Sequence, residues 1–150
     1  MDIVSRAVRS RMMGGIGPRN TQPEMTVRRY LHAAGLRYRL HARGLPGRPD
    51  IVLPAYRAVV FVHGCFWHRH LGCSNAVLPG SNRQFWVRKL TANRRRDRAA
   101  IASLRHQGWR VGVMWECAVR RKDATAILGR LENWIRGSRP FIELPALTHA

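Results

Sequence analysis

The sequence predicts a single domain of the α/β class, with helices packed on a central β-sheet. The chain has 150 residues, which is long enough for one domain with its own hydrophobic core. An apolar fraction of 45% favours a folded protein over a disordered one. Helical and strand-like patterns follow one another in the order helix, strands, helices, strand, helix, and no internal repeat interrupts them. This order is typical of a layered α/β fold.

The first predicted element is a helix over residues 21–34. Pro23 falls in its first turn and Gly35 follows its last turn, positions where these residues are common. Glu24 also lies in the first turn, where a carboxylate interacts favourably with the helix dipole. Residues 1–20, before this helix, are basic and are interrupted by glycine and proline, so we expect them to form an arm.

Three predicted strands follow the helix. Residues 36–40 alternate between apolar and basic side chains, the period of a half-buried strand. Residues 50–53 form the second strand, and after a turn at 54–57 residues 58–62 form the third. The third run is apolar on both faces, so we expect it at the centre of a sheet that is covered on both sides.

The second half of the chain is predicted to contain an irregular segment, two helices, a buried strand and a last amphipathic helix. These elements are expected at residues 64–80, 82–90, 93–107, 109–115 and 124–136. The residues from Ser138 onward are expected to be loosely attached. The chain therefore divides into an N-terminal arm (1–20), a folded domain (21–137) and a C-terminal tail (138–150).

The charge of the chain points to a polyanionic partner. The formal net charge is +19, from 27 basic and 8 acidic residues. Basic side chains that neutralise phosphates release counterions, so nucleic acid is the expected partner, and the arm is expected to order against it. Coding bias would explain why arginine outnumbers lysine, but not the surplus of base over acid. No apolar run is long enough to span a bilayer and no signal-peptide pattern follows the basic N-terminus, so we expect a cytoplasmic protein.

The three cysteines predict a metal site. An odd count of cysteines argues against a disulfide framework. Cys65, His70 and Cys73 follow the spacing Cys-x4-His-x2-Cys within one loop, and Cys117 follows a predicted buried strand. Zinc takes four such ligands in a tetrahedron, and a site with four protein ligands is closed and structural. The alternative for Cys117 alone is a small buried apolar side chain.

The sparse carboxylates suggest cleavage chemistry. No acidic residue occurs between Asp50 and Asp97. Asp50 begins one predicted strand and His63 ends the next, so a hairpin would bring them together. Phosphodiester cleavage needs a metal and a base that activates water. The arrangement resembles that of PD-(D/E)XK nucleases, although Phe61, Val62 and His63 replace the usual acid-x-lysine. The alternative is that each carboxylate merely pairs with an arginine.

Several motifs are spread along the chain. They are Leu45-Pro46-Gly47-Arg48-Pro49-Asp50, Val62-His63-Gly64-Cys65-Phe66-Trp67-His68, Phe85-Trp86, Arg96-Asp97-Arg98, Gly108-Trp109-Arg110-Val111 and Trp115-Glu116-Cys117-Ala118. Together they resemble a narrower family, the very short patch repair (Vsr-type) mismatch endonucleases, and the similarity runs from about Arg9 to Trp134. The resemblance implies a three-layer restriction-endonuclease-like fold, with a central mixed sheet flanked by helices and a zinc-bound loop.

The resemblance implies a role for individual catalytic residues. Asp50 corresponds to the principal ligand of a catalytic magnesium ion, with the backbone carbonyl of Val62 as a further ligand. Glu24 corresponds to an acid that assists at the metal waters, and His63 to a histidine near the scissile phosphate.

Further implied roles concern the general base and the structural metal. His68 corresponds to the histidine that activates the attacking water, oriented by Asp97. The implied structural zinc ligands are Cys65, His70, Cys73 and Cys117. The spacing from His70 to Cys73 is one residue longer here than in the family's usual pattern.

The remaining implied residues contact DNA. Large aromatic side chains can wedge between base pairs, and unstacking a mispair costs less than unstacking a normal pair. Two adjacent aromatics cannot both face inward on a strand, so at least one of the pair at 66–67 is expected to be free for DNA. The predicted wedge consists of Phe66, Trp67 and Trp86, with Met13 inserting from the arm. Predicted phosphate contacts are Lys89 and the run of Arg94, Arg95 and Arg96, for which a solvated helix face is the plain alternative.

We therefore expect a bacterial, nucleoid-associated monomer that nicks double-stranded DNA 5′ to the thymine of a T:G mispair arising from 5-methylcytosine deamination. Its context would include mismatch-repair proteins and a companion cytosine methyltransferase. Three alternatives stay open: a restriction-type nuclease without mismatch preference, a zinc-braced DNA-binding module without activity, and a basic ribosome-associated protein.

Overall fold

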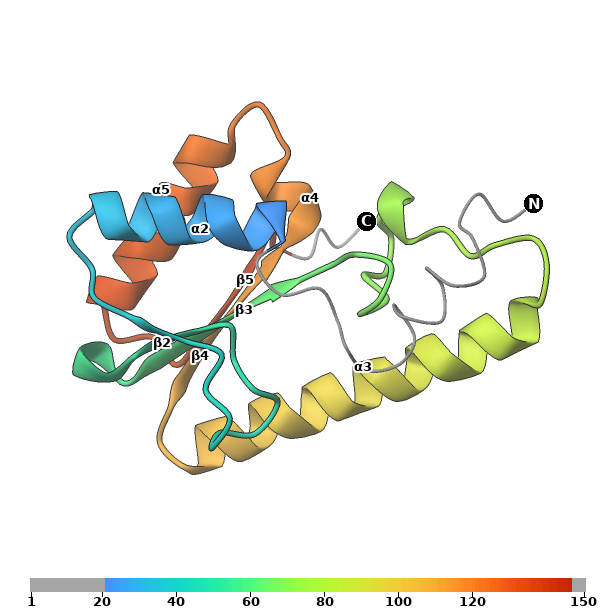
Figure 1. Cartoon of the computed structure of the whole chain (residues 1–150), viewed down its shortest axis with the longest axis horizontal. Coiled ribbons are helices and arrows are strands. Elements are labelled where there is room, and N and C mark those ends of the chain that lie inside the picture. The colour runs from blue at the N-terminus through green and yellow to red at the C-terminus, as the bar shows by residue number, and fades with distance from the viewer. Residues whose placement is uncertain (1–20, 147–150) are drawn as a thin grey trace.

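The computed structural model describes residues 21–146, which form a five-stranded mixed sheet between two layers of helices (Figure 1). The strands lie in chain order. β1 (Arg39–Leu40), β2 (Ile51–Leu53) and β3 (Ala58–His63) are antiparallel neighbours, and β4 (Arg110–Trp115) and β5 (Phe141–Leu144) continue the sheet in parallel. β3 is therefore central, as its apolar run predicts, and five of its six residues are buried.

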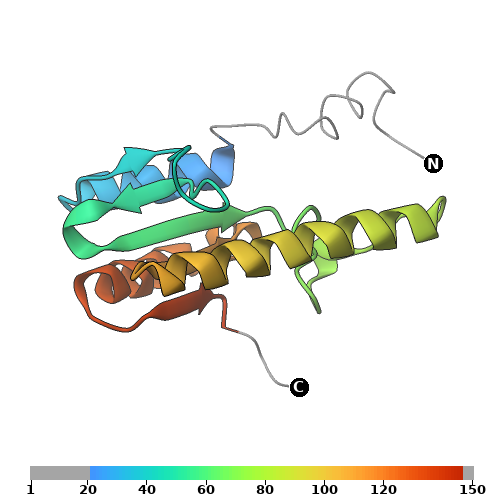
Figure 2. The same ribbon diagram turned by 90° about the horizontal axis from the view of Figure 1, so that it is seen from below.

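Helices cover both faces of this sheet. α2 (Gln22–Ala33), α4 (Glu116–Val119) and α5 (Ala124–Arg136) lie on one face, and the long α3 (Arg83–His106) crosses the other (Figures 1 and 2). Short 3-10 turns occur at Pro54–Tyr56 and Ser74–Ala76. The predicted three-layer α/β fold is confirmed. No helix within residues 21–146 has the length and apolar character needed to cross a membrane.

The sheet has a separate hydrophobic core on each face. Toward α2 and α5, strand residues pack against both helices in a core that includes Val27, Leu31, Val60, Met114 and Leu131. Toward α3, a smaller core includes Val52, Val59, Phe61, Leu104 and Val111. Because successive β3 residues enter opposite cores, that strand is held from both sides and its end is fixed in space.

Two predictions differ from the structure, and one element of the structure was not predicted. The two helices expected at 82–90 and 93–107 are one continuous helix, because no glycine or proline separates them. The loosely attached tail expected from Ser138 is wrong at Phe141–Leu144, which pair in register with β4. The helical turn of α4, directly after β4, is not predicted by the sequence pattern.

Candidate active site and metal-binding cluster

A cavity of about 860 Å³ opens where α2, the end of β3, the loop after β3 and α3 meet. Asp50 and Val62 both reach the wall of this cavity because β2 and β3 are antiparallel neighbours. All five side chains predicted to be catalytic line this single cavity. They are Glu24, Asp50, His63, His68 and Asp97.

Asp50 lies one residue before β2, beside the end of β3. Its Oδ2 accepts a hydrogen bond of 2.7 Å from the backbone N–H of Val62. Burial raises the pKa of the Asp50 carboxyl to about 7, although the Val62 N–H lowers it, and the nearby Glu24 carboxylate raises it further. A carboxyl group held in this way releases its proton to solvent when a cation binds near neutral pH.

Glu24 reaches the same cavity from the first turn of α2. The helix is capped by Thr21, whose side chain accepts from the Glu24 N–H at 3.3 Å. The Glu24 side chain is only 5% exposed and pairs with Arg28, one turn later on the helix. Ligand atoms of Glu24, His41 and Asp50 all lie within 4.8 Å of one another. Two carboxylates so close repel each other unless a proton or a cation lies between them, so the donor set suits a divalent metal ion.

His68 and Asp97 form a pair across the cavity. His68 Nδ1 and Asp97 Oδ2 are 2.7 Å apart, and Asp97 is held by α3. With Nδ1 donating to the carboxylate, His68 Nε2 is left as a proton acceptor. When His68 is protonated, its charge lowers the pKa of the Asp50 carboxyl. His68 and Asp50 therefore face the same cavity.

His63 is the last residue of β3 and lies beside His68. Its ring stacks on that of His68, with centroids 3.9 Å apart and planes at 2°. Burial holds the pKa of His63 well below its ordinary value, and the neighbouring His68 and His70 lower it further. His63 is therefore neutral at neutral pH, and it can donate or accept a hydrogen bond without adding charge.

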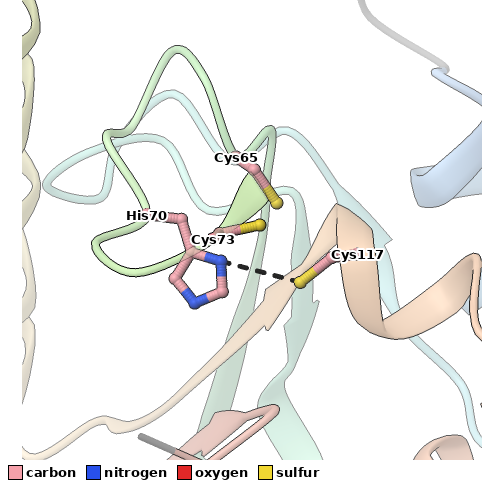
Figure 3. Close-up of side chains that lie close together, drawn as sticks. All are labelled: Cys65, His70, Cys73 and Cys117. Carbon is pink, nitrogen blue, oxygen red and sulfur yellow. Dashed lines mark hydrogen bonds between the residues drawn. The ribbon is translucent and has the colours of Figure 1, made fainter. Parts of the chain in front are cut away.

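The four predicted zinc ligands converge beside the cavity (Figure 3). One ligand atom from each lies within 4.8 Å of the others, in a cluster made of Cys65, His70, Cys73 and Cys117. β3 and β4 are parallel, so the residues after His63 and Trp115, which are paired partners, leave the sheet side by side. None of these cysteines forms a disulfide. Three sulfurs and one imidazole nitrogen are a donor set that holds a metal ion such as zinc.

Local contacts hold the loop of this cluster. The His70 N–H donates to the Cys65 carbonyl at 2.8 Å, and the Cys73 N–H donates to the His70 carbonyl at 3.2 Å. The His70 ring stacks on Trp115, with centroids 4.1 Å apart, and its Nδ1 is 3.6 Å from Cys117 Sγ. Burial raises the pKa of the Cys65 and Cys117 thiols. Without a cation the thiols stay protonated, and a bound metal would stabilise the thiolates.

The aromatic residues lie in a turn and not in a strand, so the argument from strand alternation does not apply to them. Phe66 and Trp67 nevertheless line the cavity, each partly exposed. Trp86, on α3, is buried beneath them, with ring centroids 5.4 Å from Phe66 and 6.0 Å from Trp67. Asn93 of α3 donates to the Trp67 carbonyl at 3.1 Å. The three rings form one cluster, in which Phe66 and Trp67 line the cavity and Trp86 does not.

The residues predicted to contact phosphates differ in whether they line the cavity. Lys89 and Arg96 line the cavity. Arg94 and Arg95 are not among the cavity-lining side chains of residues 21–146. Met13 lies outside the described residues.

The structure also brings in residues that sequence reasoning missed. His41, at the end of β1, and Glu116, in α4, both line the cavity. Glu116 Oε1 accepts from the Cys65 N–H at 3.4 Å, which connects the cavity to the metal-binding cluster. Glu116 lies in the Trp-Glu-Cys motif, which could have indicated that it is a functional residue. His41 lies in no motif.

Comparison with known proteins gives consistent similarities. Residues 1–74 match the family model described as DNA mismatch endonuclease Vsr. The type II nicking enzyme V.XorIIP of Xanthomonas oryzae pv. oryzae is 47% identical over 132 residues, which cover 88% of this chain and 95% of that protein. The DNA mismatch endonuclease Vsr of Escherichia coli is 42% identical over 139 residues, covering 91% and 88%. The type II nicking enzyme V.NmeAIP of Neisseria meningitidis is 42% identical over 121 residues, covering 81% and 86%.

Proposed function

Because this chain belongs to the Vsr family of DNA mismatch endonucleases, we propose that it is a DNA endonuclease that nicks one strand 5′ to the thymine of a T:G mispair. Deamination of 5-methylcytosine produces such mispairs. The observation that carries the proposal is the convergence of two carboxylates and a histidine–aspartate pair on one cavity. The relatives named as nicking enzymes support cleavage of one strand in place of two.

Asp50, Glu24 and the Val62 carbonyl are the groups that would hold a magnesium ion. The ion would polarise the scissile phosphate and make bound water more acidic. His68 accepts the proton from the attacking water at Nε2, while Asp97 holds the ring through Nδ1 and stabilises the imidazolium that forms. The buried His63 contributes a neutral hydrogen-bonding group beside the phosphate.

Zinc is the metal that we assign to the Cys65–His70–Cys73–Cys117 cluster. All four positions are filled by protein ligands, so its role is structural. It would fix the loop that carries His68, and with it the distance from that histidine to Asp50.

The mispair is recognised by Phe66, Trp67 and Trp86. Phe66 and Trp67 line the catalytic cavity and can enter the base stack as the phosphate reaches the metal, and the buried Trp86 packs against them. Unstacking a T:G pair costs less than unstacking a T:A pair, so the wedge favours the lesion. We also assign Met13 of the N-terminal arm to this wedge, and Lys89, Arg94 and Arg95 to phosphates. A monomer suffices to cut one strand, and mismatch-repair proteins and a cytosine methyltransferase are the proposed partners.

End-labelled duplexes test the proposal. Each duplex carries T:G or T:A at one position, and each is incubated with Mg²⁺ and either the wild-type protein or Asp50→Ala. We expect a nick only in the T:G duplex, immediately 5′ to the thymine, and none with Asp50→Ala. Equal cutting of both duplexes would support a general nuclease, and binding without cutting would support a DNA-binding module.

A further inference from the structure

His41 connects the helix that carries Glu24 with the strand that follows Asp50. It follows β1 directly, opposite Asp50 in the hairpin with β2. Its backbone N–H donates to the Asp50 carbonyl at 3.1 Å, and the next N–H donates to the Pro49 carbonyl at 3.3 Å. His41 takes a φ of 48°, in the left-handed region that non-glycine residues seldom adopt.

The side chain of His41 reaches across to Glu24. His41 Nε2 is 3.0 Å from Glu24 Oε2 and 3.2 Å from Oε1, and 3.3 Å from Nη2 of Arg28. The carboxylate oxygens of an ionised glutamate can only accept hydrogen bonds, so these two short contacts require a proton on Nε2. His41 therefore contacts Asp50 through its backbone and Glu24 through its ring.

Arg28 holds the Glu24 carboxylate in a different way. It pairs with Glu24 from one turn further along the same helix, so it moves with Glu24 whenever α2 shifts against the sheet. His41 directly follows β1 of the sheet, so its hydrogen bond sets the Glu24 carboxylate relative to Asp50 from outside α2. The side chain is 22% exposed, so most of this contact is shielded from water.

We propose that His41 is a positioning residue that sets the Glu24 carboxylate against Asp50 for the binding of a divalent cation. The inference rests on the proposed function, because it concerns the same metal site. His41 acts through Glu24 and does not bind the cation itself, since Nε2 cannot carry a proton toward Glu24 and donate a lone pair to a metal together.

Three variants test the role of His41. A glutamine amide nitrogen can occupy the place of Nε2, whereas the amide of asparagine reaches only as far as Nδ1. His41→Gln therefore keeps the donor, and His41→Asn removes it while suiting the left-handed backbone. His32→Asn, at an exposed histidine of α2, is the matched control. Thermal denaturation and zinc content establish that all three are folded.

The first readout is Mn²⁺ binding, followed by electron paramagnetic resonance in the absence of DNA. We expect His41→Asn to bind Mn²⁺ about 10- to 100-fold more weakly, as for other residues that orient metal ligands, and His41→Gln and His32→Asn to bind like wild type. Nitrogen hyperfine coupling of the bound Mn²⁺ should be the same in wild type and His41→Gln. Wild-type affinity in His41→Asn would overturn the proposal, and loss of a nitrogen coupling in His41→Gln would make His41 a ligand instead.

The second readout is nicking of the T:G duplex at increasing Mg²⁺. The Mg²⁺ concentration for half-maximal rate should rise in His41→Asn, while the KM for DNA and the rate at saturating Mg²⁺ stay near those of wild type. A lower saturating rate with an unchanged Mg²⁺ requirement would contradict the role. If the wild-type protein nicks no duplex, the proposed function fails, and the Mn²⁺ comparison still decides the role of His41.

Discussion

Asp50→Asn should stabilise the magnesium-free protein at pH 8 while it abolishes nicking. Asparagine keeps an acceptor for the Val62 N–H but carries no charge into the buried position. The pKa of Asp50 is about 7 in the folded protein, against an ordinary value of 3.8. The folded state therefore holds this proton more tightly than the unfolded state. The contribution of Asp50 to stability is most favourable below pH 4 and is lost as the pH rises to about 7.

The size of the effect follows from the two pKa values. One pKa unit corresponds to about 1.4 kcal/mol, so the fully ionised Asp50 destabilises the fold by about 4 kcal/mol. Part of that penalty is already present at pH 5. The stability gained by Asp50→Asn should therefore be about 2.5 kcal/mol larger at pH 8 than at pH 5.

Urea denaturation, followed by tryptophan fluorescence at both pH values, measures this difference. Zinc is kept in the buffer, so the metal-binding cluster is the same in both proteins. Mg²⁺ should then raise the unfolding free energy of wild type but not of Asp50→Asn, because only wild type binds it. A gain that is equal at pH 5 and pH 8 would refute the reasoning, since it would mean that Asp50 ionises as freely in the fold as in water.

Three further substitutions follow from the site. Asp97→Asn removes the carboxylate that holds His68 and should slow single-turnover nicking about 100- to 10,000-fold at unchanged DNA affinity; a wild-type rate would exclude the pair from the mechanism. Cys117→Ser should lower both the zinc content, measured by atomic absorption, and the melting temperature, and full zinc occupancy would remove Cys117 from the ligand set. Trp67→Ala should keep its zinc and its fold but nick T:G and T:A duplexes at similar rates, whereas intact discrimination would remove Trp67 from the wedge.

The fold was predictable where the pattern is local and strong. The run 58–62 is apolar on both faces, and it forms the central strand because only a covered strand buries both faces. β5 was missed because four residues that pair in parallel with a distant strand carry no turn or hairpin signal. α3 is one helix because Thr91 and Ala92, between the two predicted pieces, neither remove a hydrogen bond nor clash.

The site was predictable to the extent that neighbouring strands determine it. Asp50 and His63 meet because a hairpin joins the start of one strand to the end of the next. His41 could not be foreseen, because its contact with Glu24 depends on a left-handed turn and on how α2 packs against the sheet. Arg94 and Arg95 were grouped with Lys89 by charge alone, but the side of α3 on which each residue lies separates them.

A double-mutant cycle in single-turnover nicking of a T:G duplex tests most directly whether Asp50 and His68 act on the same phosphate. The cycle compares Asp50→Ala, His68→Ala and the two changes combined. If both side chains act on one phosphate, each single change should remove most of the activity, and the double variant should be little slower than the slower single variant. Losses that multiply, or a His68→Ala protein that cuts at the wild-type rate, would show that the two groups do not share a reaction centre.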